Sequence, residues 1–331
     1  MAIVAATLLT ALLAGTSGLH AAEEGWLVDF AAAKEQAAKE GKDILMEFTG
    51  SDWCPPCIAL KKNVLDTEVF KTKAPEKFIL LKLDSPRDKS KQSPAEIAQY
   101  RKLADEFKVQ GVPTIILVDA QGRPYAKTVG FGGQKAEDYV ETLVKNQESR
   151  TKRDEALAKA EKAEGAEKAK LLDEALAVVD AEMAIAQYRD IVDQIVALDA
   201  DNAGGLKAKY GSLLSASEVR SALQAIVRGF ATDGVEASVK KIDELLEAKK
   251  PTGALLQEVL VMKGQMYLQT DKAKAKEVLE AAQKADPEGQ LARQIGAFLK
   301  SQFPAEEKSG DEKKSDEKKS DAADAKKEGD K

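Results

Sequence analysis

The sequence has 331 residues, of which 44% are hydrophobic and 5% aromatic, and its formal net charge is −6. This length permits two domains, and an acidic chain gives no reason to expect a nucleic-acid partner. Two cysteines and one histidine are too few to supply the four ligands of a structural zinc site, and we expect no metal and no cofactor.

An apolar stretch at residues 3–18 opens the chain, followed by small residues and then by charge at residues 19–24. This pattern is typical of a cleaved secretory signal, which we place at residues 1–22. An uncleaved anchor is the alternative, because no lysine or arginine precedes the stretch. We expect export to the periplasm or cell envelope. Cleavage would remove His20, the single histidine, and with it any Ser-His or Cys-His catalysis.

Helices and strands alternate in the part of the chain that follows the signal. The expected order is helix, strand, helix, strand, helix, strand, strand, helix. Strands are expected over residues 43–49, 77–84, 115–118 and 125–129. One helix begins at Cys54. Another begins at Ser93, where a serine cap, Pro94 at the first helical position and Glu96 three residues after the cap form a strong helix start. A helix around residues 139–144 closes this part.

The two cysteines lie in the run Trp53-Cys54-Pro55-Pro56-Cys57, between a strand and a helix. A structural disulfide closing so short a loop would constrain the unfolded chain little, which favours redox exchange over a structural role. Cys54 at the helix start faces unpaired N–H groups that favour its thiolate, so we assign it as the nucleophile. Cys57, one turn later, is predicted to resolve the mixed disulfide.

Glu47 is a carboxylate inside an otherwise apolar strand, and two interpretations are open. It lies on the solvent face of the sheet, or it is buried and carries a proton for Cys57. The sequence alone does not choose between them.

These residues resemble the thioredoxin superfamily over residues 26–147. The resemblance lies in Trp-Cys-x-x-Cys after a strand, the order of elements, and Gly-Val-Pro-Thr opening the third strand. It implies an α/β thioredoxin fold, with a central mixed sheet flanked by helices, over residues 23–147. It also implies that Pro113 is cis beside the cysteines, that Val112 offers its backbone to an extended substrate, and that Trp53 contributes to substrate binding. Glu47 matches the buried acid of the family, although one extra residue precedes Trp53. The motif looks like that of exported bacterial members.

Residues 148–303 are predicted to form an all-helical domain, because apolar residues recur at helical spacing there. Part of this region resembles the tetratricopeptide pattern, and a plain helical bundle is the alternative. The matching positions are Leu260, Gly264, Tyr267, Ala275, Leu279, Ala282 and Asp286-Pro287. Residues 304–331 consist mainly of Lys, Asp, Glu and Ser, and we expect this tail to be disordered.

The sequence therefore predicts an exported thiol–disulfide oxidoreductase that exchanges its Cys54–Cys57 pair with client proteins. A further redox partner would recharge the site, and the helical domain could bind another protein. Reduction, oxidation and isomerisation of client disulfides are all compatible with this motif. The alternative function is a protein-interaction module built on the helical repeats, in which the thioredoxin-like domain is a redox sensor or an inert scaffold.

Overall fold

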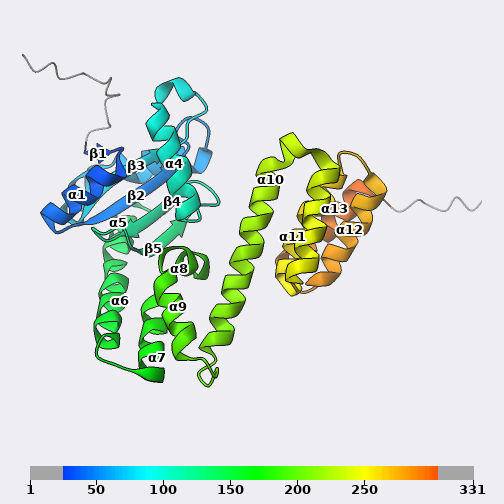
Figure 1. Cartoon of the computed structure of the whole chain (residues 1–331). Helices are drawn as coiled ribbons and strands as arrows, with labels where there is room; N and C mark the ends of the chain where they lie inside the picture. Colours follow the sequence, from blue (N-terminus) through cyan, green and yellow to red (C-terminus); the bar gives the residue numbers. More distant parts are fainter. Residues whose placement is uncertain (1–24, 305–331) are drawn as a thin grey trace, which may run out of the picture. The chain divides into compact units, whose positions relative to one another are not determined.

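A computed structural model describes residues 25–304 of the chain (Figure 1). The predicted signal peptide, and the predicted tail from residue 305 onward, lie outside the described residues. Contacts divide the chain into two compact units, Met1–Ser221 and Ala222–Lys331. Within residues 25–304, no helix combines the length and apolarity needed to cross a bilayer.

A five-stranded mixed sheet forms the centre of the first unit, in the order β1-β3-β2-β4-β5. Its strands are β1 (Trp26–Leu27), β2 (Asp43–Thr49), β3 (Phe78–Asp84), β4 (Thr114–Val118) and β5 (Pro124–Val129). The β1–β3 and β2–β3 pairs are parallel, whereas β2–β4 and β4–β5 are antiparallel. The predicted mixed sheet is thus confirmed. The two-residue strand β1 was not predicted.

Helices cover both faces of this sheet. They are α1 (Phe30–Glu40), α2 (Pro55–Leu60), the π-helical turn η1 (Lys61–Leu65), α3 (Glu68–Lys77), the 3-10 turn η2 (Lys89–Lys91), α4 (Pro94–Glu106) and α5 (Ala136–Lys145). The helix start predicted at Ser93 is confirmed, because Ser93 and Glu96 form a complete capping box at α4. Helix α3, capped by the side chain of Thr67, was not predicted.

The alternation of β2 divides the apolar core into two layers. Ile44, Met46 and Phe48 pack in one cluster with residues of α1 and α4. Leu45 packs in the other, with residues of α2, η1, α3 and α5. Because successive side chains of a strand point to opposite faces, Glu47 lies on the same face as Leu45. That face is covered by the helix that carries the cysteines.

Four more helices follow α5 in the first unit, before α10 begins. They are α6 (Gln147–Ala160), α7 (Gly165–Leu176), α8 (Ala181–Gln187) and α9 (Arg189–Leu198). By contacts these helices belong to the same compact unit as the sheet, and the predicted domain boundary after residue 147 stays a prediction. The division between the two compact units falls within α10 (Leu206–Lys249), a helix interrupted at Gly234, where φ is +75°.

Buried polar contacts join α6 to the sheet. Arg150 forms an ion pair with the buried Asp43, which also accepts a hydrogen bond from Gln147 Nε2 at 2.9 Å. Arg153, fully buried, donates to Asp119 at 2.6 Å and to Tyr188 Oη at 2.9 Å. Because buried charges need partners, these contacts account for the inclusion of α6 in the first unit.

The second unit is helical. After α10 it contains α11 (Gly253–Tyr267), α12 (Lys272–Ala285) and α13 (Gln290–Gln302). Helices α12 and α13 share a core of Leu279, Ala282, Ile295 and Leu299. Among residues 25–304 no strand follows Val129, which confirms the predicted all-helical region. Its assignment to a tetratricopeptide-like repeat stays a prediction.

Candidate redox site

Cys54 and Cys57 form a disulfide, with an S–S distance of 2.06 Å, at the start of α2. Cys54 is the N-cap residue, and its sulfur accepts a hydrogen bond from the N–H of Cys57 at 3.3 Å. Pro55 and Pro56 occupy the first turn of the helix, where N–H groups have no intrahelical partner to lose. Both cysteines are buried, at 3% and 2% exposure.

The loop before β4 lies against the sulfur of Cys54. The carbonyl oxygen of Val112 is 3.5 Å from Cys54 Sγ. The Val112–Pro113 peptide bond is cis, as the family resemblance implied. The carbonyl of Pro113 accepts a hydrogen bond from the N–H of Gly130 at 2.7 Å, so the end of β5 holds this loop in place. The structure therefore brings Val112 and Pro113 together with the disulfide.

Trp53 is half-exposed beside the disulfide, at 39% exposure, and its position is fixed by the two loops around it. Its indole Nε1 donates to the carbonyl of Ser85 at 2.8 Å. The ring lies directly against Gly50 and leaves no room for a side chain there, because a Cβ on Gly50 would fall 2.5 Å from Trp53 Cε2. The carbonyl of Gly50 also accepts the N–H of Cys54 at 3.0 Å. The loop thus sets Trp53 and Cys54 together.

Glu47 is buried, at 3% exposure, which excludes the interpretation that placed it on the solvent face. It is in register with Lys82 of β3 and Ile115 of β4. On the same face, burial and the nearby Glu47 carboxylate raise the pKa of the Tyr139 phenol. The buried Tyr139 hydroxyl itself has no hydrogen-bond partner among residues 25–304. Glu47 therefore lies in the apolar layer beneath the α2 face of the sheet.

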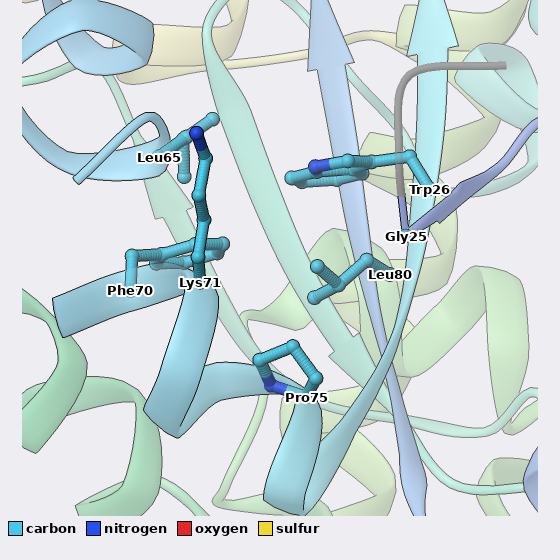
Figure 2. A pocket seen from close by; sticks show the side chains of 7 residues that line it. All are labelled: Gly25, Trp26, Leu65, Phe70, Lys71, Pro75 and Leu80. Atoms are coloured by element: carbon cyan, nitrogen blue, oxygen red, sulfur yellow. The ribbon is translucent and has the colours of Figure 1, made fainter. Parts of the chain in front are cut away.

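A hollow of about 340 Å³ lies beside β1 and α3 (Figure 2). In this view Trp26, Phe70, Lys71 and Pro75 border it. No residue of the predicted redox site lines it. Nowhere in residues 25–304 do three or more His, Cys, Asp or Glu side chains gather as a metal could require. The disulfide is therefore the chemically distinctive feature of the first unit.

Comparison with known proteins agrees with this geometry. Residues 30–147 match the family model described as a thioredoxin-like domain. Over 116 residues the chain is 32% identical to the disulfide bond reductase DsbH of Chlamydia pneumoniae, an alignment that covers 35% of this chain and 68% of that relative. The chain belongs to the thioredoxin-like family. It is a thiol–disulfide oxidoreductase of that family, as the sequence predicted.

Other similar proteins share lower sequence identity with the chain. The thioredoxin-related protein DsbJ of Chlamydia pneumoniae is 27% identical over 146 residues, which cover 42% of this chain and 41% of DsbJ. A solved structure titled DsbH oxidoreductase is 28% identical, with a TM-score of 0.35, covering 41% of this chain and 92% of the other. A thioredoxin from Thermus thermophilus is 20% identical, with a TM-score of 0.29, covering 36% and 84%.

Sequence reasoning missed the contacts between the cysteine loop and residues 84–92. Asp84 accepts hydrogen bonds from the N–H of Ser51 at 3.0 Å and from its hydroxyl at 2.5 Å. Asp52 accepts the N–H of Arg87 at 2.9 Å. The sequence offered one indication, because Ser51 and Asp52 are short polar residues immediately before the motif and are well suited to bind loop backbone.

Proposed function

We propose that this protein is an exported disulfide reductase that acts on protein clients through Cys54. The observation that carries the proposal is the Cys54–Cys57 bond at the start of α2, with the Val112 carbonyl 3.5 Å from the Cys54 sulfur. The reductive direction is supported by the relative DsbH, which is named a disulfide bond reductase.

The surface around the disulfide supports protein clients. In the described part of the first unit, the exposed large hydrophobic residues are Trp53, Ile58 and Val129. Trp53 precedes Cys54 and Ile58 follows Cys57, while Val129 pairs with Thr114 next to Pro113. Exposed apolar residues gathered at one place on a protein surface commonly mark a protein-binding site.

The reaction begins with the reduced dithiol. The Cys54 thiolate attacks one sulfur of a client disulfide, forming a mixed disulfide and releasing one client thiolate. Cys57, as a thiolate, then attacks the Cys54 sulfur. The Cys54–Cys57 bond forms, the mixed disulfide breaks, and the second client thiolate leaves and takes up a proton. Two electrons pass from the pair to the client, and a dithiol reductant must return two electrons before the next cycle.

Glu47 and the loop before β4 supply two supporting roles. Buried on the α2 face of the sheet, Glu47 takes the proton from Cys57 as that thiol becomes the attacking thiolate. Val112, with its carbonyl beside Cys54 Sγ, binds the backbone of an extended client segment next to Pro113. Trp53 covers the client's flanking side chains.

Trapping of the mixed disulfide tests this proposal. A Cys57→Ser variant, reduced and mixed with a disulfide-containing protein such as insulin, should accumulate a covalent complex that dithiothreitol releases. The wild-type protein should catalyse insulin reduction by dithiothreitol, and Cys54→Ser should abolish both reactions. Catalysis that persists in Cys54→Ser would contradict the proposal.

A further inference from the structure

The segment that connects β3 to α4 is joined to the redox loop by several contacts. We call residues 85–92 the basic segment, because its exposed side chains include Arg87, Lys89 and Lys91. Its first residue, Ser85, accepts the hydrogen bond from the Trp53 indole and donates its own N–H to the carbonyl of Thr49 at 2.9 Å. Its last residue, Gln92, donates to the carbonyl of Asp84 at 2.7 Å. The basic segment is therefore held at both ends beside Trp53.

Arg87 is held in this segment through both its backbone and its side chain. Its N–H is bound to Asp52, the residue before Trp53, and its guanidinium carbon lies 6.0 Å from the centre of the Trp53 ring. This arrangement is a cation–π contact, which holds the charge over the aromatic face while leaving the guanidinium donors free for another partner. The side chain thus presents a positive charge at the surface that faces a client.

The nearby carboxylates are bound to other groups. Asp84 accepts two hydrogen bonds from Ser51. Asp52 accepts the N–H groups of Arg87 and Asp88, and the Arg87 N–H is the main cause of the lowered pKa of Asp52. Asp88 accepts the N–H and the hydroxyl of Ser90. These carboxylates serve the loop structure, while Arg87 projects over the exposed indole.

We propose that Arg87 is a specificity-determining residue, which pairs with a carboxylate that flanks the reacting cysteine of a client disulfide. The inference rests on the proposed function, because it assigns the class of client that the same site selects. In this inference the client segment that reaches Cys54 lies over Trp53, where an Asp or Glu side chain would meet the guanidinium in a bidentate pair. Clients with acidic residues beside the cysteine would then react faster than clients with basic ones.

Three matched peptides, each closed by one intramolecular disulfide, test this inference. They differ only in the two residues before the first cysteine, which are Asp-Asp, Ser-Ser or Lys-Lys. Full-length protein is reduced, freed of reductant and mixed with each peptide. The rate constant for oxidation of the protein's Cys54–Cys57 dithiol is measured by acid quenching and alkylation. The wild type should prefer the acidic over the basic peptide, by roughly threefold to tenfold at low salt, with the preference shrinking as added salt screens the charges.

Variants at Arg87 show whether the preference among peptides depends on the charge or on the shape of this side chain. Arg87→Gln should lower the acidic-to-basic ratio by roughly two- to fivefold, Arg87→Lys should keep at least half of it, and Arg87→Glu should reverse the preference. Lys39→Gln removes an exposed cation near the end of α1, on the side of β2 away from Cys54, and should leave the ratio unchanged.

The outcomes distinguish this inference from the proposed function. An unchanged ratio in Arg87→Glu overturns the role of Arg87, even if every peptide oxidises the protein rapidly. If none of the three peptides oxidises the reduced wild type, the proposed function itself fails. Reversal in Arg87→Glu together with an unchanged ratio in Lys39→Gln supports both.

Discussion

Gly50 is the residue on which the position of Trp53 depends. A Cβ at this position would lie 2.5 Å from Cε2 and 2.7 Å from Nε1 of the indole, closer than atoms approach without one of them moving. In Gly50→Ala we expect the ring to turn away and lose its hydrogen bond to Ser85, lowering the free energy of unfolding by about 1 kcal/mol. The Trp53 indole N–H signal in an NMR spectrum should shift, and its hydrogen exchange should become faster.

Gly111→Ala is the matched control for this substitution. Gly111 also lies in a loop of the redox site, but a Cβ added to it would meet no atom of the described residues within 4 Å. The indole signals and the stability of this variant should stay close to those of the wild type. Equal effects of the two substitutions would show that Gly50 has no special relation to Trp53.

Glu47 should affect the second step of the exchange rather than the first. Glu47→Gln keeps the shape of the side chain but cannot accept the proton of Cys57, so the mixed disulfide should persist longer, with resolution slowed by roughly tenfold to a hundredfold. Stopped-flow oxidation with quenching separates the two steps. A uniform slowing of both steps would contradict the proton-carrying role.

At this scale, the sequence predicted the residues with strong local signals. Cys54, Cys57 and Pro113 lie in short motifs whose spacing defines their place relative to strands and helices. Strand alternation alone could not decide the burial of Glu47, because it assigns Glu47 and Leu45 to one face without showing which helices cover it. Only the family resemblance favoured a buried position. Arg153 is fully buried in a helix rich in Lys, Arg and Glu, where every charged residue would be expected to face solvent.

Helix α6 is attached to the sheet mainly through charged groups, so removing one of them should be costly. Arg153→Ala leaves the buried Asp119 without the guanidinium that lies 2.6 Å away. We expect it to lower the free energy of unfolding by about 3 to 5 kcal/mol, as measured by urea denaturation. Arg189→Ala, which removes an exposed pair with Asp193, should cost less than about 1 kcal/mol. Similar losses would contradict this account of α6.

The same contact gives the first unit a dependence on acid. Burial alone would raise the pKa of Asp119, but the N–H of Arg123 and the guanidinium groups of Arg153 and Arg123 together hold that pKa below its ordinary value. The folded protein therefore binds this proton less readily than the unfolded chain. The stabilisation is present above about pH 4, the ordinary range for aspartate, and is lost as the pH falls further.

Urea denaturation between about pH 2.5 and 6 measures this effect. The free energy of unfolding of the wild type should fall as the pH drops below about 4. Asp119→Asn should be less stable at about pH 6. Its free energy of unfolding should also depend less on pH, because the asparagine side chain cannot bind a proton in this range. Parallel profiles for the two proteins would contradict the contribution of Asp119.

Helix α3 shows why some elements could not be predicted. Pro75 lies inside it, and only Phe70 and Ala74 are buried, so its apolar periodicity is weak and its proline suggests a break. Elements with strong periodicity or caps, such as β2, β3 and α4, were placed within about one residue of their observed bounds.

The extent of the first unit has a consequence for the whole molecule. A chain that ends at residue 147 would leave Asp43 without Arg150, and Asp119 without Arg153. A chain that ends at residue 221 keeps both pairs. We expect the shorter chain to be less stable by several kcal/mol and to be degraded more rapidly by protease. Equal stability of the two would show that the predicted boundary at residue 147 is a sufficient end for the folded domain.

The predicted boundary at residue 147 rests on a pattern that reports secondary structure and does not report packing. After Gln147 the strand pattern ends and helical spacing takes over, which is a change of secondary structure and not of packing. Whether the following helices join the sheet depends on Arg150, Arg153 and Tyr188 meeting partners 30 or more residues away in sequence. Such pairings leave no trace in local composition.

The bond between Cys54 and Cys57 also allows the fraction of reduced molecules to be measured directly. Both cysteines of the sequence are in this one bond, so the oxidised chain offers no sulfhydryl to an alkylating reagent and the reduced chain offers two. After alkylation, the mass of each oxidised molecule is unchanged, and the mass of each reduced molecule is higher by two alkyl groups. A mass spectrum of protein quenched from living cells would thus report, as two separated peaks, the fraction of the population that holds its electron pair.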